Sequence, residues 1–198
     1  MVIFDDSTGL SASLAKIGVV TLVEPAAKTL DDAYAQVEEL GVATGHRGSA
    51  GALAASMRAQ IANLTAGVAP RRPPLRVFDE LDQTLYSVTS ATFIGQLFKT
   101  MGAANIADAA DKTGSGYPQL SDEYVVKANP DVIFLSDTKC CQQDQATVAA
   151  RPGWSGIAAV GHQRVVAIDD DIASRWGPRL VLLVAIIAGA LSASAVTG

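Results

Sequence analysis

The chain has 198 residues, 49% of them hydrophobic, so it can bury a substantial core in one or two domains. Its formal net charge is −5 and it carries no basic stripe, which excludes a typical nucleic-acid-binding protein. The two cysteines, Cys140 and Cys141, are adjacent, which excludes a disulfide framework and a Cys/His zinc site.

The N-terminal segment predicts short strands that alternate with helices. Residues 2–4 and 19–23 have the apolar, β-branched character of strands, and residues 10–17 and 29–40 predict helices. Thr29 is the expected N-cap of the second helix, which should end at Gly41. No basic segment precedes the first strand, so we expect no signal peptide and a chain that begins within a truncated first lobe.

A long helix is expected over residues 49–66. Apolar side chains recur there at steps of three or four residues: Leu53, Met57, Ile61, Leu64 and Val68. Ser49 is the expected N-cap, and Gly67 with the prolines after it should end the helix. Because α/β patterns occur on both sides, we interpret this helix as a connection between two lobes.

The remaining segment again alternates strands and helices. Strands are expected at residues 75–78, 132–135 and 165–168, with helices at residues 92–101, after Ser121 and after Pro178. The unbroken apolar run 132–135 is typical of a parallel strand covered on both faces. Residues 180–191 are too short for a membrane span, which needs about 18–20 residues, so we favour a core helix over a spanning one.

These elements predict an α/β fold: two Rossmann-like lobes with mainly parallel sheets, joined by one long helix, the first lobe incomplete. The expected domains are the remainder of the N-terminal lobe (residues 1–45), the interlobe helix (residues 46–70) and a C-terminal ligand-binding lobe (residues 71–198).

Catalytic and metal-binding motifs are missing from the sequence. His46 and His162 are the only histidines, and neither has a cysteine or histidine at metal spacing. The glycines before the long helix lack the spacing of a phosphate-binding loop, so a flexible lead-in is favoured. We therefore expect no enzymatic activity, no metal and no cofactor.

Three loops of the second segment are rich in aromatic and charged side chains: residues 85–90, 114–118 and 169–179. If they share the carboxyl edge of one sheet, their aromatic rings and one arginine would face a common space. Such a space suits a large, flat or anionic ligand. Solvated loops, packing of Tyr117 against its own loop, and an ion pair of Arg175 with residues 169–171 remain alternatives. Trp154 is interpreted as a core anchor.

An ordered set of motifs runs through the second segment: Asn105-Ile106-Ala107, Ser121-Asp122-Glu123-Tyr124-Val125, Asn129-Pro130-Asp131-Val132-Ile133, Arg151-Pro152-Gly153-Trp154, Ala158-Ala159-Val160, Arg175 and Pro178-Arg179. This set resembles the second lobe of the substrate-binding proteins of ABC importers for cobalamin, ferric siderophores and haem. The resemblance extends from Val2 onward and implies two α/β lobes joined by one long helix.

The resemblance also implies functional residues. Five fall at or beside the positions where members contact their ligands: Tyr86, Tyr117, Asp171, Arg175 and Trp176. Glu123 matches the acidic residue with which this lobe docks on an arginine of the membrane permease, and a capping-box role is the alternative.

The expected protein is therefore a monomeric, extracytoplasmic solute-binding protein, in the periplasm or at the cell surface and lipid-anchored in its full-length form. It would capture a cobalamin-like or ferric-siderophore ligand between two lobes and deliver it to an ABC permease. Cobalamin is favoured over siderophores because it is large and mostly uncharged, and haem stays open. The alternative function is a subunit of a metal-cluster or redox enzyme on a related scaffold, which would use the cysteine pair. Adjacent Cα atoms lie only ~3.8 Å apart, closer than in ordinary bridges, so two free thiols are expected.

Overall fold

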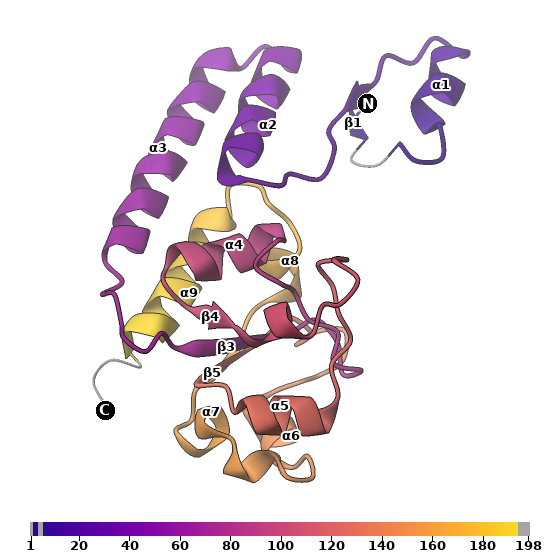
Figure 1. Cartoon of the computed structure of the whole chain (residues 1–198). Helices are drawn as coiled ribbons and strands as arrows, with labels where there is room; N and C mark the ends of the chain where they lie inside the picture. Colours follow the sequence, from indigo (N-terminus) through magenta and orange to yellow (C-terminus); the bar gives the residue numbers. More distant parts are fainter. Residues whose placement is uncertain (1, 4–5, 194–198) are drawn as a thin grey trace. The chain divides into compact units, whose positions relative to one another are not determined.

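The computed structural model of the chain describes residues 2–3 and 6–193 (Figure 1). The chain divides into two compact units, Met1–Ala54 and Ala55–Gly198, with the boundary inside helix α3. Each unit is described by itself.

The first unit contains two short parallel strands and two helices before α3. Strand β1 (Val2–Ile3) pairs with β2 (Leu22–Val23), with α1 (Leu10–Ala15) between them in sequence. Strand β2 is shorter than predicted, and Phe4 lies outside the described residues. Helix α2 (Leu30–Ala43) begins with the predicted cap, in which the hydroxyl of Thr29 accepts a hydrogen bond from the backbone N–H of Asp32.

The prediction that α2 ends at Gly41 is wrong, because this glycine serves helix packing instead. A Cβ atom at Gly41 would lie 2.1 Å from the Cβ of Ala50, so only glycine allows α2 and α3 to approach this closely. Helix α3 (Arg47–Ala66) confirms the long predicted helix but begins two residues early, so Ser49 is not its N-cap. Its role as a connection between lobes stays a prediction.

The apolar stripe predicted for α3 is only partly buried. Met57 and Ile61 are buried, whereas Leu53 is 39% exposed. Ala50 and Ala54 are buried, and Ala50 makes the close contact with Gly41 of α2, where a small side chain is required.

The second unit is built on a four-stranded parallel sheet in the order β4-β3-β5-β6. Its strands are β3 (Arg76–Glu80), β4 (Ala104–Asn105), β5 (Val132–Leu135) and β6 (Val165–Ala167). Val77 lies opposite Val132, and Ile133 lies opposite Val165. Because neighbouring strands are parallel, their carboxyl ends lie at one edge of the sheet.

Helices cover both faces of this sheet (Figure 1). One side carries α4 (Phe93–Thr100) and α9 (Leu180–Ala193); the other carries α5 (Asp122–Ala128), α6 (Gln145–Ala149) and α7 (Ala158–Gly161). Short helices η1 (Ile106–Ala109), η2 (Trp154–Gly156) and α8 (Asp170–Ala173) lie in the connections. All four residues of β5 are fully buried, which confirms the prediction of a strand covered on both faces.

Alternate residues of β5 serve the two faces. Phe134 stacks on Phe98 of α4 with ring centroids 5.0 Å apart, whereas Ile133 and Leu135 pack in a core cluster with Trp154. Trp154 is completely buried, and its indole Nε1 donates a 2.7 Å hydrogen bond to Asp122. The prediction that Trp154 is a core anchor is therefore confirmed.

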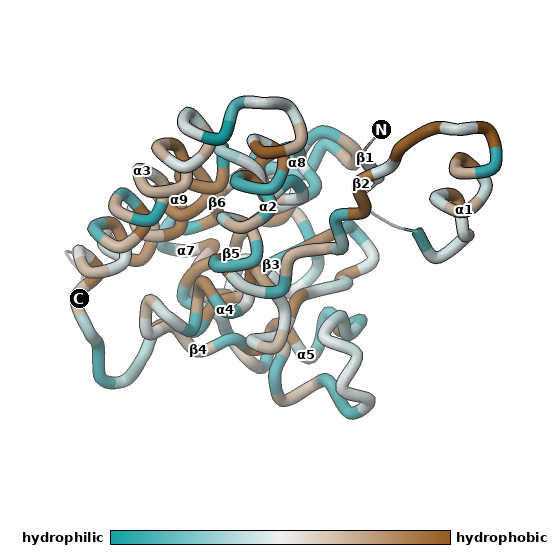
Figure 2. The backbone as a smooth tube through the Cα atoms, turned by 90° about the horizontal axis from the view of Figure 1, so that it is seen from above, coloured by the Kyte–Doolittle hydropathy of each residue, from teal (hydrophilic) through white to brown (hydrophobic). Residues whose placement is uncertain are grey.

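The last helix is apolar on most of its surface, and its tube is largely brown in Figure 2. Leu180, Leu183 and Ile187 are fully buried, as expected for a core helix. Within the described ranges, no helix combines the length and apolar character needed to cross a membrane. The predicted α/β class with parallel sheets is confirmed.

Candidate functional site

The strand order creates a natural place for a ligand. From β3 the chain passes to β4 on one side and then returns to β5 on the other, so the connections leave the sheet in opposite directions. Ligands of open α/β sheets bind outside the carboxyl ends of the strands at such a switch point.

A pocket of about 250 Å³ lies at this edge. It is lined by residues that follow all four strands: Leu81, Val88, Thr92, Ile94, Tyr117, Ser136, Ala173, Ser174 and Trp176. The three loops singled out in the sequence therefore do contribute to one pocket, together with the start of α4 and the residue after β5. Tyr117 and Trp176 are the predicted site residues that line it.

Backbone pairing holds Tyr117 at the pocket. The N–H of Ser87 donates to the carbonyl of Pro118 (3.0 Å), and the N–H of Thr89 donates to the carbonyl of Gly116 (2.9 Å). The carboxylate of Asp111 accepts a 2.7 Å hydrogen bond from the N–H of Gly116, and this bond lowers the pKa of Asp111. The loop that carries Tyr117 is thus fixed at both ends.

Trp176 forms the aromatic wall with help from α4. Its ring stacks on that of Phe93, the first residue of the helix, with centroids 4.5 Å apart and planes inclined by 22°. Thr92 caps this helix by accepting a hydrogen bond from the N–H of Gly95 (3.1 Å). The Nε1 atom of Trp176 is buried and has no hydrogen-bond partner within residues 2–3 and 6–193, which leaves an unused donor in a residue of the pocket.

The other three predicted ligand residues do not line the pocket. Tyr86 is 41% exposed and bridges to Gln119 through the backbone, two residues before Val88. Arg175 forms a 3.0 Å ion pair with Asp171, so the alternative considered for this arginine is present. Arg175 and Trp176 are adjacent in the chain, but only Trp176 lines the pocket, whereas the guanidinium of Arg175 pairs with Asp171. Ligand contact by these residues stays a prediction.

Buried acids lie behind the pocket wall, and sequence reasoning missed them. The hydroxyl of Ser136 donates a 2.9 Å hydrogen bond to Asp79, which is fully buried in β3. Burial raises the pKa of Asp79 to about 7, and burial together with the nearby Glu80 raises the pKa of Asp137 to about 7. A signal was available, because these residues stand at the carboxyl ends of β3 and β5.

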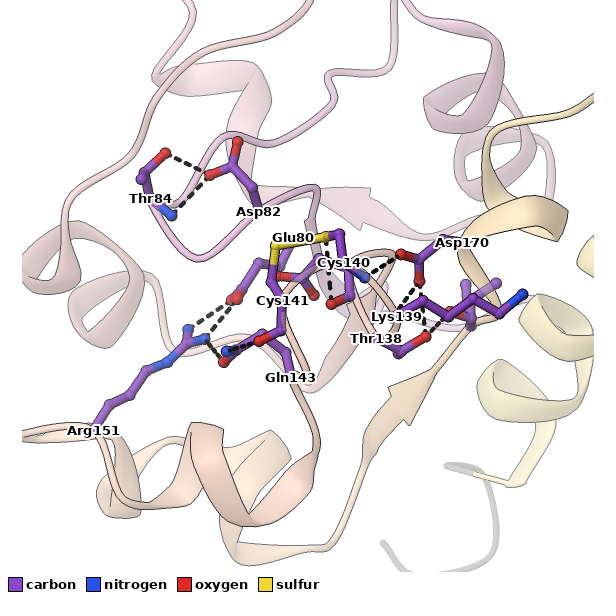
Figure 3. The surroundings of a disulfide bond; sticks show 12 residues. Glu80, Asp82, Thr84, Thr138, Lys139, Cys140, Cys141, Gln143, Arg151 and Asp170 are labelled. Atoms are coloured by element: carbon purple, nitrogen blue, oxygen red, sulfur yellow. Dashed lines mark hydrogen bonds and ion pairs between the residues drawn. A yellow bond between two sulfur atoms is a disulfide. The ribbon is translucent and has the colours of Figure 1, made fainter.

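A buried ion pair supports the same edge. Both guanidinium NH groups of Arg151 donate to the carboxylate of Glu80, at 2.6 and 2.5 Å (Figure 3). Arg151 also donates to the side-chain oxygen of Gln143 (2.7 Å) and stacks over the ring of Trp154 at 4.5 Å. The sequence motif contained Arg151, but its partner, 71 residues away in the chain, could not be identified there.

The expectation of two free thiols is wrong. Cys140 and Cys141 are joined in a disulfide, although their Cα atoms are 3.8 Å apart (Figure 3). The turn that follows β5 brings the two sulfur atoms together, with Gln142 in the left-handed conformation (φ 54°) just after them. Among the described residues, no three His, Cys, Asp or Glu side chains are arranged to hold a metal ion.

Glu123 is exposed at the second position of α5. Its carboxylate accepts hydrogen bonds from its own N–H and from the hydroxyl of Ser121, and both lower its pKa, so it is ionised at neutral pH. Ser121 caps the helix through the N–H of Tyr124, which occupies the position that a capping-box glutamate would need. The capping-box alternative is therefore wrong, and docking stays a prediction.

Comparison with known proteins adds the family. The chain is 33% identical over 168 residues to an uncharacterized ABC transporter substrate-binding lipoprotein, YvrC, of Bacillus subtilis (strain 168), covering 83% of this chain and 51% of that protein. It is 31% identical over 173 residues to a cobalamin-binding protein of Halobacterium salinarum, covering 85% of this chain and 46% of that protein. The chain thus spans about half the length of these curated relatives.

Solved structures share the fold. The haem-binding protein RhuT of Roseiflexus sp. RS-1 superposes with a TM-score of 0.79 at 21% identity, covering 93% of this chain and 71% of that one. The vitamin B12-binding protein BtuF of Vibrio cholerae superposes with a TM-score of 0.72 at 23% identity, covering 96% of this chain and 71% of that one. The sequence profile of the periplasmic binding proteins matches residues 3–172. With this match over most of its length, the chain belongs to the periplasmic binding protein family.

Proposed function

We propose that this chain carries the ligand-binding lobe of the solute-binding component of an ABC importer, which captures a cobalamin-like or ferric-siderophore ligand and delivers it to the permease. The carrying observation is an aromatic pocket at the switch point of a chain that belongs to the periplasmic binding protein family. The names of relatives, a cobalamin-binding protein and an ABC substrate-binding lipoprotein, support the same function.

The size and charge of the pocket favour a large, mostly uncharged ligand. Its volume of about 250 Å³ is below the roughly 300–1,000 Å³ of ordinary small-molecule sites, so it would receive one part of a larger ligand. Tyr117 and Trp176 offer aromatic faces for a conjugated ring. The nearby cations are engaged, because Lys139 and Arg175 both pair with Asp171. Cobalamin therefore fits better than a highly anionic ferric catecholate.

No observation favours the metal-cluster or redox enzyme considered from the sequence. Iron–sulfur clusters are held by free cysteine thiolates, whereas Cys140 and Cys141 are bonded to each other. We therefore propose a binding protein without catalytic activity.

The proposed location is outside the cytoplasm, with a lipid anchor on the complete protein, which acts as a monomer. The lipoprotein relative supports this location, and so does the disulfide, because disulfides persist in oxidising compartments. Cell fractionation, mass spectrometry of the N-terminal peptide and sedimentation of the complete gene product test it. A cytoplasmic, unmodified or oligomeric product would contradict the respective part.

Ligand binding is tested by calorimetric titration of the complete gene product with cyanocobalamin, a ferric siderophore and haemin. Tryptophan emission provides a second signal, because Trp176 lines the pocket while Trp154 is fully buried in the core. We expect quenching by one of the ligands, and the Trp176→Phe variant should lose most of the response from this chain. The absence of heat and quenching with all three ligands would refute the proposed function.

Substitution of Arg175 distinguishes anionic ligands from cyanocobalamin. An anionic ligand that takes this guanidinium from Asp171 should bind about 1.5–3 kcal/mol more weakly to the Arg175→Ala variant, because a charged hydrogen bond is lost. Cyanocobalamin should bind to it almost unchanged. The control is Arg179→Ala, which removes a neighbouring guanidinium from the same turn. If the wild type, Arg175→Ala and Arg179→Ala bind every anionic ligand with equal affinity, Arg175 is excluded from the site.

Permease docking is tested at Glu123, whose ionised carboxylate lies exposed at the start of α5. Glu123→Gln keeps the shape of the side chain and removes its charge. We expect unchanged ligand affinity and reduced transport with the permease reconstituted in proteoliposomes. Full transport by the variant would show that this carboxylate is not a docking contact.

A further inference from the structure

The disulfide between Cys140 and Cys141 lies in a turn with a solvent-exposed side. Cys140 is exposed and Cys141 is half-buried. The backbone N–H of Cys141 donates to the carbonyl of Asp137 at 3.2 Å, and the Sγ of Cys140 lies 3.7 Å from the same oxygen. Cys140 therefore lies at the surface of a turn that is held at its base by the carbonyl of Asp137.

One carboxylate fastens this turn to the next loop of the sheet edge. Asp170 accepts hydrogen bonds from the hydroxyl of Thr138 (2.8 Å), the N–H of Lys139 (2.9 Å) and the N–H of Cys140 (2.9 Å; Figure 3). The ammonium of Lys139 adds ion pairs to Asp169 (2.8 Å) and to Asp171 (2.9 Å). The backbone of the disulfide turn thus supplies two of these three hydrogen bonds to the carboxylate of Asp170.

The segment before the disulfide turn and the segment after Asp170 both line the pocket. Ser136 precedes the turn and lines the pocket, and Ser174 and Trp176 follow Asp170 and line it from the other loop. The hydroxyl of Ser174 donates to the carbonyl of Asp170 at 2.6 Å. Three residues therefore separate Cys140 from Ser136 on one wall, and the carboxylate of Asp170 connects Cys140 to the other wall.

The other side of the turn connects to the buried ion pair. The side chain of Gln143 donates to the carbonyl of Cys141 (2.9 Å) and accepts from Arg151 (2.7 Å), which binds Glu80. Figure 3 shows the disulfide between these two polar networks, with Asp170 on one side and Arg151 on the other. The bridge therefore restrains the segment that joins both networks.

We propose that Cys140–Cys141 is a thiol–disulfide exchange site that controls the ligand affinity of the pocket; the control of affinity rests on the proposed function. A dithiol reductant attacks the Sγ of Cys140, the more exposed of the two residues, and Cys141 leaves as a thiolate. The second thiol of the reductant then attacks its own sulfur in the mixed disulfide and releases Cys140. The reductant becomes a cyclic disulfide, and the two cysteines receive two electrons and two protons.

The oxidised form is the high-affinity state. The intact bridge fixes the backbone N–H groups of the turn on Asp170 and so holds Ser174 and Trp176 in place. Reduction removes the covalent restraint, and the released thiol of Cys140 can donate to the carbonyl of Asp137. The turn then moves more freely. Ligand binding must order the pocket, and the entropic cost of this ordering reduces the binding free energy.

The experiment compares three forms of the complete gene product: the oxidised protein, the same protein reduced with dithiothreitol and desalted without oxygen, and the variant Cys140→Ser/Cys141→Ser. Alkylation and peptide mass spectrometry count the thiols at residues 140 and 141. Hydrogen exchange is followed in peptides that cover residues 136–142 and 170–176, and calorimetry gives the Kd for cyanocobalamin, haemin and a ferric siderophore.

We expect dithiothreitol to expose both thiols in the folded protein, to speed hydrogen exchange in both peptides and to weaken the ligand that binds by at least about five-fold. The serine variant should have the Kd and the hydrogen exchange of the reduced protein, and dithiothreitol should change neither. If this variant does not fold, reoxidation of the reduced wild type should restore its affinity. A bridge that resists reduction, or oxidised and reduced Kd values within two-fold, overturns the inference. If no form binds any probe, the proposed function fails, and unchanged exchange at residues 170–176 then overturns the coupling as well.

Discussion

The buried ion pair between Glu80 and Arg151 permits a quantitative prediction. Glu80 is fully buried and the Arg151 side chain is only 15% exposed, so the Arg151→Met variant leaves a buried carboxylate without its cation. Breaking such a pair by removing one partner typically costs about 3–5 kcal/mol. Methionine keeps an apolar stem beside Trp154, so most of the loss should be electrostatic.

Urea unfolding of the wild type and the variant at pH 7 measures this loss. The matched control is Glu80→Gln/Arg151→Met, which leaves no buried carboxylate without its cation and should be destabilised less than Arg151→Met alone. A loss below 1 kcal/mol in Arg151→Met, or an equal loss in both variants, would refute the assignment of a buried ion pair.

Two further predictions concern the same sheet edge. Burial raises the pKa values of Asp79 and Asp137 from 3.8 to about 7, so the folded chain holds protons that the unfolded chain has released between about pH 4 and 7. Stability should therefore fall as pH rises through this range, and thermal unfolding at pH 5 and pH 8 should show a smaller difference in Asp79→Asn/Asp137→Asn; equal stability of the wild type at both values would contradict it. A Cβ at Gly95 would lie 1.8 Å from the carbonyl oxygen of Thr89, so Gly95→Ala should destabilise the chain by about 3 kcal/mol in urea unfolding. Gly48→Ala, in an exposed helix position with nothing within 4 Å, is the control and should be neutral or stabilising; equal effects of both changes would show that the close contact is unimportant.

Much of the architecture could be predicted from the sequence because its causes are local. Thr29, Thr92 and Ser121 cap their helices through hydrogen bonds that span three residues. The apolar run of β5 marked a strand covered on both faces. Parallel strands bring their carboxyl ends to one edge, so the loops with Tyr117 and Trp176 could be expected to meet.

The details of the site depended on packing between distant segments. The sequence could not show that Glu80 pairs with Arg151, 71 residues away, nor that Ser136 bonds to Asp79, because such contacts arise only when the strands are in register. Gly41 was interpreted as a helix end, whereas its missing side chain allows a close helix contact.

The sequence by itself thus determined the α/β class, the Thr29 cap and the edge at which the loops gather, since these follow from periodicity and short-range hydrogen bonds. Only the tertiary structure decided which side chains line the pocket. It placed Trp176 at the pocket and its neighbour Arg175 on Asp171, and it closed the Cys140–Cys141 bridge. The direction of a side chain in a loop is set by the surfaces that pack against it, and those surfaces come from other parts of the chain.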